Sequence, residues 1–225
     1  MHELAEGVYA FTQELETDEG TRAFHPAAVE TDRGILLLDA GLGGHADELG
    51  EELAAAGFDW ADVWAVLLTH HDGDHAGALE TVVERTDAVV FAHAACAPYL
   101  DGRADLEKGD GDRYPPVAVD VELTDDAVVR TAAGPMRLLF TPGHAPGHVS
   151  LYLPDERLLL AADALTAADG ELQGPSERFT LDMDEAGESV ARLADLPVDR
   201  VHCYHGGTVE AGTERITEIA ASLAE

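Results

Sequence analysis

Side chains that bind metal ions gather in one short stretch of the sequence, residues 69–75, directly after the apolar run 63–68. The strong candidate ligands in this stretch are His70, Asp72, Asp74 and His75. Histidine and aspartate together bind divalent transition metals. A strand that leads into such a cluster would deliver its ligands to the edge of a sheet, so this stretch predicts a metal site.

Three more candidate ligands follow, each near the end of an expected strand. His144 lies in segment 141–148, whose two Pro-Gly pairs predict sharp turns and an ordered loop. Asp163 ends the apolar run 158–162, where an ionised carboxylate is costly unless a positive charge faces it. His205 comes just after a short expected strand. Together with the earlier cluster, these residues could hold two metal ions.

The charge of the chain is strongly one-sided, with 45 acidic and 13 basic residues and a net charge of −32. The acidic residues are spread along the whole chain, whereas an acidic interaction tail would be a block of like charge. Because a Debye length of about 3 Å in molar salt screens such repulsion, we expect a halophilic protein. The lack of a basic patch argues against a nucleic-acid partner.

The length and composition are those of a globular protein, with 225 residues of which 46% are hydrophobic. Two cysteines, Cys96 and Cys203, cannot build a disulfide framework, and we expect free buried thiols. No apolar run reaches the length of a signal peptide or a membrane span. We therefore expect a cytoplasmic protein with no membrane partner.

Hydrophobic patterning predicts alternating strands and helices, and so an α/β fold. Strands are expected at 8–12, 27–30, 35–38, 63–68, 88–92, 117–123, 127–131, 136–141, 149–153, 158–162 and 200–203. Helices are expected at 45–56, 76–85, 184–193 and 212–223. The polar segment 98–116, here named the cap segment, shows no periodicity and predicts a loop or cap over one face. No linker composition divides the chain, so a single domain, 1–225, is expected.

The order of the candidate ligands resembles the metallo-β-lactamase superfamily, whose usual first motif is His-x-His-x-Asp-His. The resemblance extends to the opening hairpins, to Leu38-Asp39-Ala40-Gly41, to the Thr-Pro-Gly-His segment and to the terminal His-Gly. It implies a four-layered αβ/βα sandwich with the metals in a cleft at one edge of the two sheets. Most members of the superfamily are hydrolases, although redox and nuclease members exist.

Carried over by position, the resemblance implies the metal ligands His70, Asp72 and His144 for one ion and Asp74, His75 and His205 for the other, with Asp163 bridging. His148 would orient a ligand, as outer partners of a metal site do, but the sequence alone does not choose between His148 and His144. Asp39 is a similar orienting candidate, with a plain strand-end cap as an equal alternative. His71 and His93 are expected to be structural or exposed.

Asp72 is the departure from the superfamily motif, because it stands where the usual second histidine would be. Two divalent ions carry +4, so five histidines and two aspartates leave +2, whereas four histidines and three aspartates leave +1. The added negative charge should make a bound water less acidic. Zinc is the expected metal, and the hard oxygen ligand of Asp72 improves the prospects of manganese or iron.

The resemblance and the ligand types together predict a metal-dependent hydrolase that uses a dinuclear centre and a bridging hydroxide to cleave a small ester, thioester or lactone. Asp74 would both bind a metal and accept a hydrogen bond from the nucleophile. Tyr204 or Tyr99 could help to stabilise the oxyanion. The expected partner is a small-molecule substrate, whose identity the sequence leaves open, as it does the oligomeric state.

Two alternatives remain open. The first is a di-iron redox protein related to the flavodiiron core, which has a carboxylate at the position of Asp72 but normally carries a fused flavodoxin-like domain that is absent here. The second is a non-catalytic binding module that keeps the fold. It is the less favoured one, because all seven ligand positions hold competent side chains.

Overall fold

The computed structural model describes residues 1–17, 20–108 and 113–224. Residues 109–112, inside the cap segment, lie outside this description. The chain divides into an N-terminal unit, Met1–Leu123 with Arg130–Ala133, and a C-terminal unit, Thr124–Val129 with Gly134–Glu225. The single domain expected from the sequence stays a prediction, and each unit is described by itself.

The N-terminal unit contains a seven-stranded mixed sheet with the order β1-β2-β5-β6-β7-β8-β9. Its strands are β1 (His2–Ala5), β2 (Val8–Ala10), β5 (Ala27–Thr31), β6 (Gly34–Leu38), β7 (Val63–Leu68), β8 (Val89–His93) and β9 (Val121–Leu123). The pairs from β1 to β6 are antiparallel. The pairs from β6 to β9 are parallel, so the carboxyl ends of these four strands lie at one edge.

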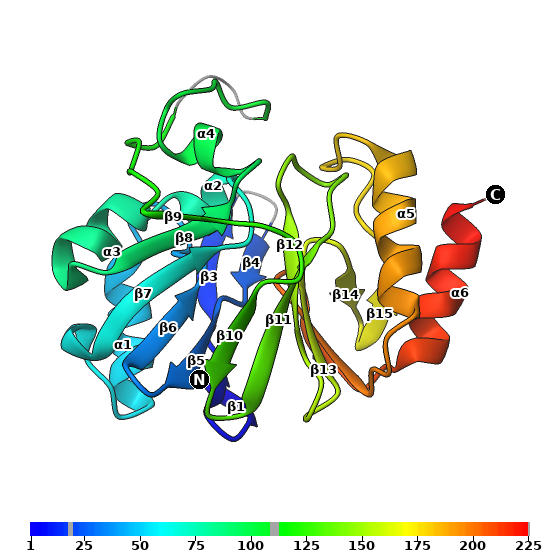
Figure 1. Cartoon of the computed structure of the whole chain (residues 1–225), viewed down its shortest axis with the longest axis horizontal. Helices are drawn as coiled ribbons and strands as arrows, with labels where there is room; N and C mark the ends of the chain where they lie inside the picture. The colour runs from blue at the N-terminus through cyan, green and yellow to red at the C-terminus, as the bar shows by residue number, and fades with distance from the viewer. Residues whose placement is uncertain (18–19, 109–112, 225) are drawn as a thin grey trace. The chain divides into compact units, whose positions relative to one another are not determined.

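Two helices cover one face of this sheet, α1 (Ala46–Ala55) and α3 (Leu79–Thr86), as Figure 1 shows. Leu49 and Leu53 of α1 recur at the i, i+4 spacing of a helix face, and they share one buried cluster with Leu37 and Val66 of the sheet. Burial of such an apolar face is the main source of helix stability in a protein. Shorter turns are η1 (Trp60–Asp62), α2 (Gly73–Ala76) and α4 (Ala97–Leu100).

A six-stranded sheet, most of which belongs to the C-terminal unit, has the order β10-β11-β12-β13-β16-β17. Its strands are β10 (Val128–Thr131), β11 (Gly134–Phe140), β12 (Val149–Leu153), β13 (Leu158–Ala162), β16 (Arg200–Cys203) and β17 (Gly207–Val209). β13 and β16 are parallel, whereas β11, β12 and β13 run antiparallel in turn. Helices α5 (Met183–Ala194) and α6 (Thr213–Leu223) lie side by side against the sheet (Figure 1). Of the helices that the structure describes, none has the length and hydrophobicity needed to span a bilayer.

Most expected strands and helices are present within one to three residues of their predicted bounds, but the expected helix 76–85 is wrong at its start. Two elements occupy this stretch: α2 ends at Ala76 and α3 begins at Leu79. Gly77 separates them where the chain crosses closely, since a Cβ there would lie 2.2 Å from the Gly73 carbonyl oxygen and 2.6 Å from the Gly43 nitrogen. The expected strand 117–123 is likewise reduced to β9.

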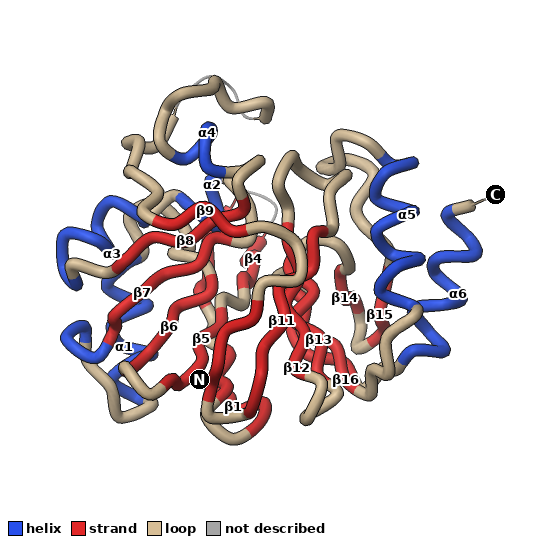
Figure 2. The backbone as a smooth tube through the Cα atoms, viewed as in Figure 1, coloured by secondary structure: helices blue, strands red, loops and turns tan. Residues whose placement is uncertain are grey.

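Two hairpin ribbons escape sequence prediction because they lack an apolar face. They are β3 (Gln13–Thr17) with β4 (Gly20–Phe24), and β14 (Thr166–Ala168) with β15 (Glu171–Gln173). Figure 2 shows the remaining connections as loops, among them the described part of the cap segment after α4. The hydrophobic pattern of a sequence does not reveal a hairpin whose side chains are mostly exposed to solvent.

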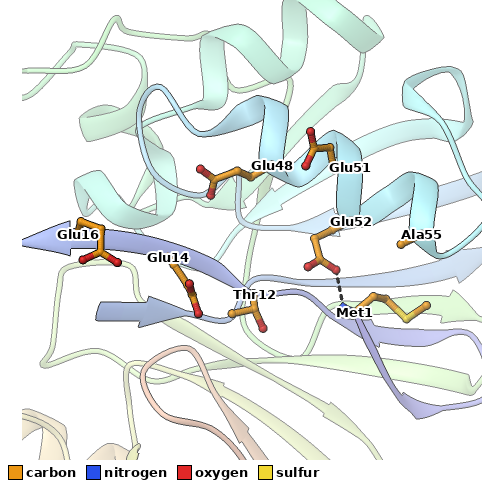
Figure 3. Close-up of a pocket in the computed structure, with 8 residues that line it drawn as sticks. All are labelled: Met1, Thr12, Glu14, Glu16, Glu48, Glu51, Glu52 and Ala55. Atoms are coloured by element: carbon orange, nitrogen blue, oxygen red, sulfur yellow. Dashed lines mark ion pairs between the residues drawn. The ribbon is translucent and has the colours of Figure 1, made fainter. Parts of the chain in front are cut away.

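An acidic hollow of about 610 Å³ lies beside α1 and β3 in the N-terminal unit (Figure 3). It is lined by Met1, Thr12, Glu14, Glu16, Glu48, Glu51, Glu52 and Ala55. Glu52 pairs with the α-ammonium group of Met1, and Glu48 contacts His45 Nδ1 at 2.9 Å. The five glutamates of the hollow concentrate like charge in one place, so the stability of this region should depend on screening by salt.

We expect the melting temperature of the protein to rise with KCl, and Glu51→Gln to raise it in dilute buffer only. Removing one carboxylate from this cluster should stabilise the folded state by about 0.5 kcal/mol, the scale of a like-charge pair on a helix. In molar KCl the gain should vanish because screening already removes the repulsion. Thermal melts of both proteins at the two salt concentrations test this. An equal gain at both concentrations would contradict the electrostatic explanation.

Candidate metal centre

The ligand-rich stretch of the N-terminal unit begins where the buried strand β7 ends. Asp72 stands at the N-cap of α2, and its carbonyl oxygen accepts hydrogen bonds from the nitrogens of His75 at 3.0 Å and Ala76 at 2.9 Å. This tight turn brings the rings of His70 and His75 together, with centroids 3.9 Å apart. Both histidines are fully buried, whereas Asp74 keeps 25% of its side chain exposed.

Imidazole and carboxylate atoms face each other within this stretch. The distance from His70 Nε2 to Asp72 Oδ2 is 3.5 Å, and the distance from His75 Nε2 to Asp74 Oδ2 is 4.0 Å. Ligands at about 2.1 Å from one tetrahedral ion lie about 3.4 Å from each other. The first pair already has this spacing, and the second pair would need to close by about 0.6 Å.

Asp39 fixes the orientation of His75. It follows β6, the parallel neighbour of β7, and it adopts a left-handed backbone with φ of 69°. Its carboxylate accepts hydrogen bonds from His75 Nδ1 at 2.8 Å and from Thr69 N at 2.7 Å and Thr69 Oγ1 at 2.8 Å. Because a carboxylate can only accept, Nδ1 of His75 carries the proton and Nε2 is left as the donor of a lone pair. Asp39 therefore both caps its strand and orients a candidate ligand.

The backbone after Asp39 holds His75 from its other side. The nitrogens of Ala40 and Gly41 both donate to the carbonyl oxygen of His75, at 2.8 and 2.9 Å. Leu67 O accepts from Asp39 N at 2.9 Å, which continues the pairing of β6 with β7 beyond the strand end. His75 is thus restrained through both its ring and its main chain.

Three candidate ligands of the C-terminal unit meet at one edge of its sheet. Asp163 follows β13 and His205 follows β16, and these strands are parallel neighbours. Segment 141–148 joins the antiparallel strands β11 and β12, so it turns at the same edge. Asp163 Oδ2 lies 3.3 Å from His144 Nε2 and 3.2 Å from His205 Nε2. One carboxylate oxygen therefore faces two imidazole nitrogens.

His148 has a different role from His144. Its Nδ1 lies 2.9 Å from the Thr141 carbonyl oxygen, and its Nε2 accepts a hydrogen bond from Asp163 N at 3.1 Å. Both ring nitrogens of this buried side chain thus contact main-chain atoms, whereas Nε2 of His144 faces the Asp163 carboxylate. The residue before Asp163, Ala162, has a left-handed φ of 48°, and the bond from His148 helps to hold this strained turn.

The loop that carries His144 is packed tightly against the start of α5. Gly143 has φ of +117°, and a Cβ at this position would lie 2.2 Å from the nitrogen of Ala186. Asp182, the N-cap of α5, donates its backbone N–H to the Gly143 carbonyl oxygen at 2.9 Å. The Pro-Gly signal in the sequence therefore marks a close approach of two backbones, which only glycine permits.

The cap segment contacts the ligand stretch directly. The Tyr99 ring stacks on the His71 ring with centroids 4.3 Å apart, and Tyr114 Oη donates to the His71 carbonyl oxygen at 2.7 Å. Lys108 Nζ lies 2.7 Å from Asp72 Oδ2. Sequence reasoning missed Lys108 and Tyr114 as contacts of the site. The one signal for Lys108 was that it is the only lysine of the chain.

The two tyrosines suggested as oxyanion donors have different surroundings. Tyr99 Oη donates to Glu107 Oε1 at 2.7 Å, and this bond raises the pKa of Tyr99 to about 12. Tyr204 is buried, and its ring makes a T-shaped contact with the His205 ring, with centroids 5.5 Å apart. His93, at the end of β8, accepts a hydrogen bond on Nδ1 from Ala95 N at 3.2 Å.

Both cysteines are free and buried, as expected from the sequence. Burial raises the pKa of the Cys96 and Cys203 thiols well above the ordinary value. Both thiols are therefore protonated in the metal-free protein.

We expect Asp39→Asn to weaken zinc binding by about 10–100-fold, the usual effect of losing the partner that orients a ligating histidine. Competition of the folded protein with a chromophoric chelator measures the affinity. Asp87→Asn is the matched control, since Asp87 also has a left-handed backbone, with φ of 53°, but stands at the C-terminal end of α3. Equal zinc affinity in both variants would rule out the orienting role of Asp39.

Comparison with known proteins places this chain in a family. The sequence profile of the metallo-beta-lactamase superfamily matches residues 27–205. The probable metallo-hydrolase YflN of Bacillus subtilis is 27% identical, over 98% of this chain and 92% of that protein. A hydroxyacylglutathione hydrolase of Cereibacter sphaeroides is 30% identical over 75% of this chain, which spans only 60% of that enzyme.

Solved structures agree with the sequence comparison. A metallo-beta-lactamase family protein from Thermus thermophilus aligns with a TM-score of 0.75 and 27% identity, covering 97% of this chain and 80% of that one. This confirms the α/β metallo-beta-lactamase fold that the resemblance implied, and its sheets are mixed. The chain belongs to the metallo-beta-lactamase superfamily and is a metallo-hydrolase of that fold.

Proposed function

We propose that this metallo-hydrolase binds two divalent metal ions and hydrolyses a small acyl ester, thioester or lactone. The proposed ligands are His70, Asp72 and His144 for one ion, Asp74, His75 and His205 for the other, and Asp163 between them. Zinc is the proposed metal, and the carboxylate of Asp72 favours manganese or iron more than a histidine would.

The donor set fits such a centre chemically. Imidazole nitrogens and carboxylate oxygens are the usual protein ligands of zinc. The observation that carries the proposal is the position of Asp163, whose Oδ2 lies 3.3 and 3.2 Å from the Nε2 atoms of two histidines assigned to different ions. With both nitrogens unprotonated, these three atoms are all acceptors, and cations between them would relieve their mutual repulsion.

The protein's own residues would prepare the reaction. Two bound ions would supply Lewis acidity and a water acidified toward neutral pH. Asp74 is more exposed than Asp72, with 25% of its side chain in solvent against 13%, which suits it to accept a hydrogen bond from that water. Asp39 and His148 would hold His75 and Asp163 in place during the reaction, through the bonds at 2.8 and 3.1 Å.

An acyl thioester is the substrate class that we favour. The hydroxyacylglutathione hydrolase of Cereibacter sphaeroides is named for an acyl thioester, and thioesters share the electrophilic carbonyl of esters and lactones. The net charge of −32 disfavours a polyanionic substrate such as a nucleic acid. We also propose that the protein works in a salt-rich cytoplasm, where its charge is screened.

A substrate panel in molar KCl tests this proposal. Protein purified without chelator would be analysed for metals and assayed with thioester, lactone, ester, phosphodiester and β-lactam substrates. Hydrolysis of an acyl substrate that is lost on metal removal and restored by zinc supports the proposal. Bound iron with oxygen consumption and no hydrolysis would instead support the redox alternative.

Asp74→Ala should lower kcat on the best panel substrate by about 10²–10⁴-fold, the range for loss of a positioned acid–base group. Metal content must be measured on the same preparation, because Asp74 is also a proposed ligand. Asp105→Ala removes an exposed carboxylate of the cap segment and is the matched control, expected to keep full activity. Unchanged kcat in metal-loaded Asp74→Ala would contradict the assignment.

A further inference from the structure

The most unexpected contact of the ligand stretch is an ion pair between Asp72 and Lys108, with Nζ 2.7 Å from Oδ2. We propose that Lys108 is a positioning residue that acts through Asp72, and that its charge compensates the carboxylate which replaces the usual histidine. The pair Asp72–Lys108 would then add the same net charge to the centre as one neutral imidazole. This inference rests on the proposed function, because it assigns Lys108 to the same centre.

Burial separates this pair from an ordinary surface ion pair. The side chain of Lys108 is 18% exposed and that of Asp72 is 13% exposed. By contrast, Arg103 of the cap segment is 55% exposed and contacts Asp101 and Glu122 away from the ligand stretch. Exposed pairs contribute little to stability, about 0–1 kcal/mol, whereas a partly desolvated pair interacts more strongly.

Described residues on each side of Lys108 in the sequence contact the ligand stretch. Before it, Tyr99 stacks on the His71 ring, and after it, Tyr114 donates to the His71 carbonyl oxygen. Arg113 closes the segment on itself by donating to the carbonyl oxygens of Ala104, at 3.1 Å, and of Tyr99. In the sequence, Lys108 therefore stands between two tyrosines that both contact His71, the residue next to Asp72.

The net charge of the proposed centre shows what the Asp72–Lys108 pair would contribute. Two divalent ions with four histidines and three aspartates leave +1, and adding the ammonium group of Lys108 restores +2. This is the value that the usual five-histidine site has without a lysine. Because the acidity of a bound water follows the local positive charge, Lys108 would return to the centre the Lewis acidity that Asp72 removes.

Loss of Lys108 should move metal affinity and turnover in opposite directions. A cation near a metal ion repels it, so Lys108→Gln should bind zinc more tightly, by about tenfold. The same change lowers the positive charge that activates water, so kcat should fall by about tenfold, the scale for outer partners of a metal centre. A variant that merely disturbs the cap segment would instead weaken binding and turnover together.

The experiment compares four single variants and one double variant with the parent protein in molar KCl. Zinc affinity is measured by competition with a chromophoric chelator, and kcat with the best substrate of the panel. Lys108→Arg keeps the charge and should keep both values close to those of the parent. Arg103→Gln removes a cap cation outside the site and should change neither.

The deciding comparison measures the effect of Lys108→Gln in the parent protein and in the Asp72→His variant. With a histidine at position 72, Lys108 loses the carboxylate that holds its ammonium group beside the centre, so Lys108→Gln should lower kcat far less than it does with Asp72 present. An equal loss of kcat in both backgrounds would overturn the proposal and would mean that Lys108 acts on the substrate. Weaker or unchanged zinc binding in Lys108→Gln would overturn it as well.

The zinc titrations separate this inference from the proposed function, because they need no substrate. A parent protein that binds zinc but hydrolyses nothing on the panel contradicts the proposed function, and the affinity of Lys108→Gln still decides the role of the lysine. A parent protein that binds no zinc overturns both.

Discussion

The hydrogen bond between Asp39 and His75 is the constraint on which the N-terminal half of the candidate centre depends. It joins the end of β6 to the turn after β7, across two parallel strands. Parallel strands place their carboxyl ends at one edge, but they do not orient the side chains there. The left-handed backbone of Asp39 turns its carboxylate toward Thr69 and His75, and a carboxylate with this many donors is itself held firmly.

In the C-terminal unit, different residues orient the candidate ligand at the strand end. Here the carboxylate, Asp163, is a candidate ligand, and the histidine that holds it, His148, binds its backbone nitrogen. The left-handed residue is Ala162, one position earlier, where a bulge interrupts the pairing of β13 with β16. In both units, backbone strain at a strand end is compensated by buried hydrogen bonds to a histidine, which is a recurrent way to aim a functional side chain.

Sequence patterning predicted that the candidate ligands follow strands, and the structure places them there, because an apolar run followed by His or Asp is a local signal. His148 could not be separated from His144 in this way, since only the hydrogen bond to Asp163 N distinguishes them. The contact of Lys108 with Asp72 could not be predicted for a related reason. The two residues are 36 positions apart, and no periodicity links a loop residue to its partner. Helix α3 was placed too early because the close approach of Gly77 to Gly43 is a tertiary contact.

The docking of the cap segment on His71 has an evolutionary consequence. In many enzymes a surface loop can change its sequence to admit a new substrate while the catalytic residues stay as they are. Here Tyr99, Lys108 and Tyr114 each contact His71 or Asp72, inside the ligand stretch itself. A substitution that reshapes this segment therefore also shifts the surroundings of the candidate ligands. Under the proposed function, a change of substrate range through this segment would also alter the metal chemistry, which would narrow the paths along which specificity can diverge.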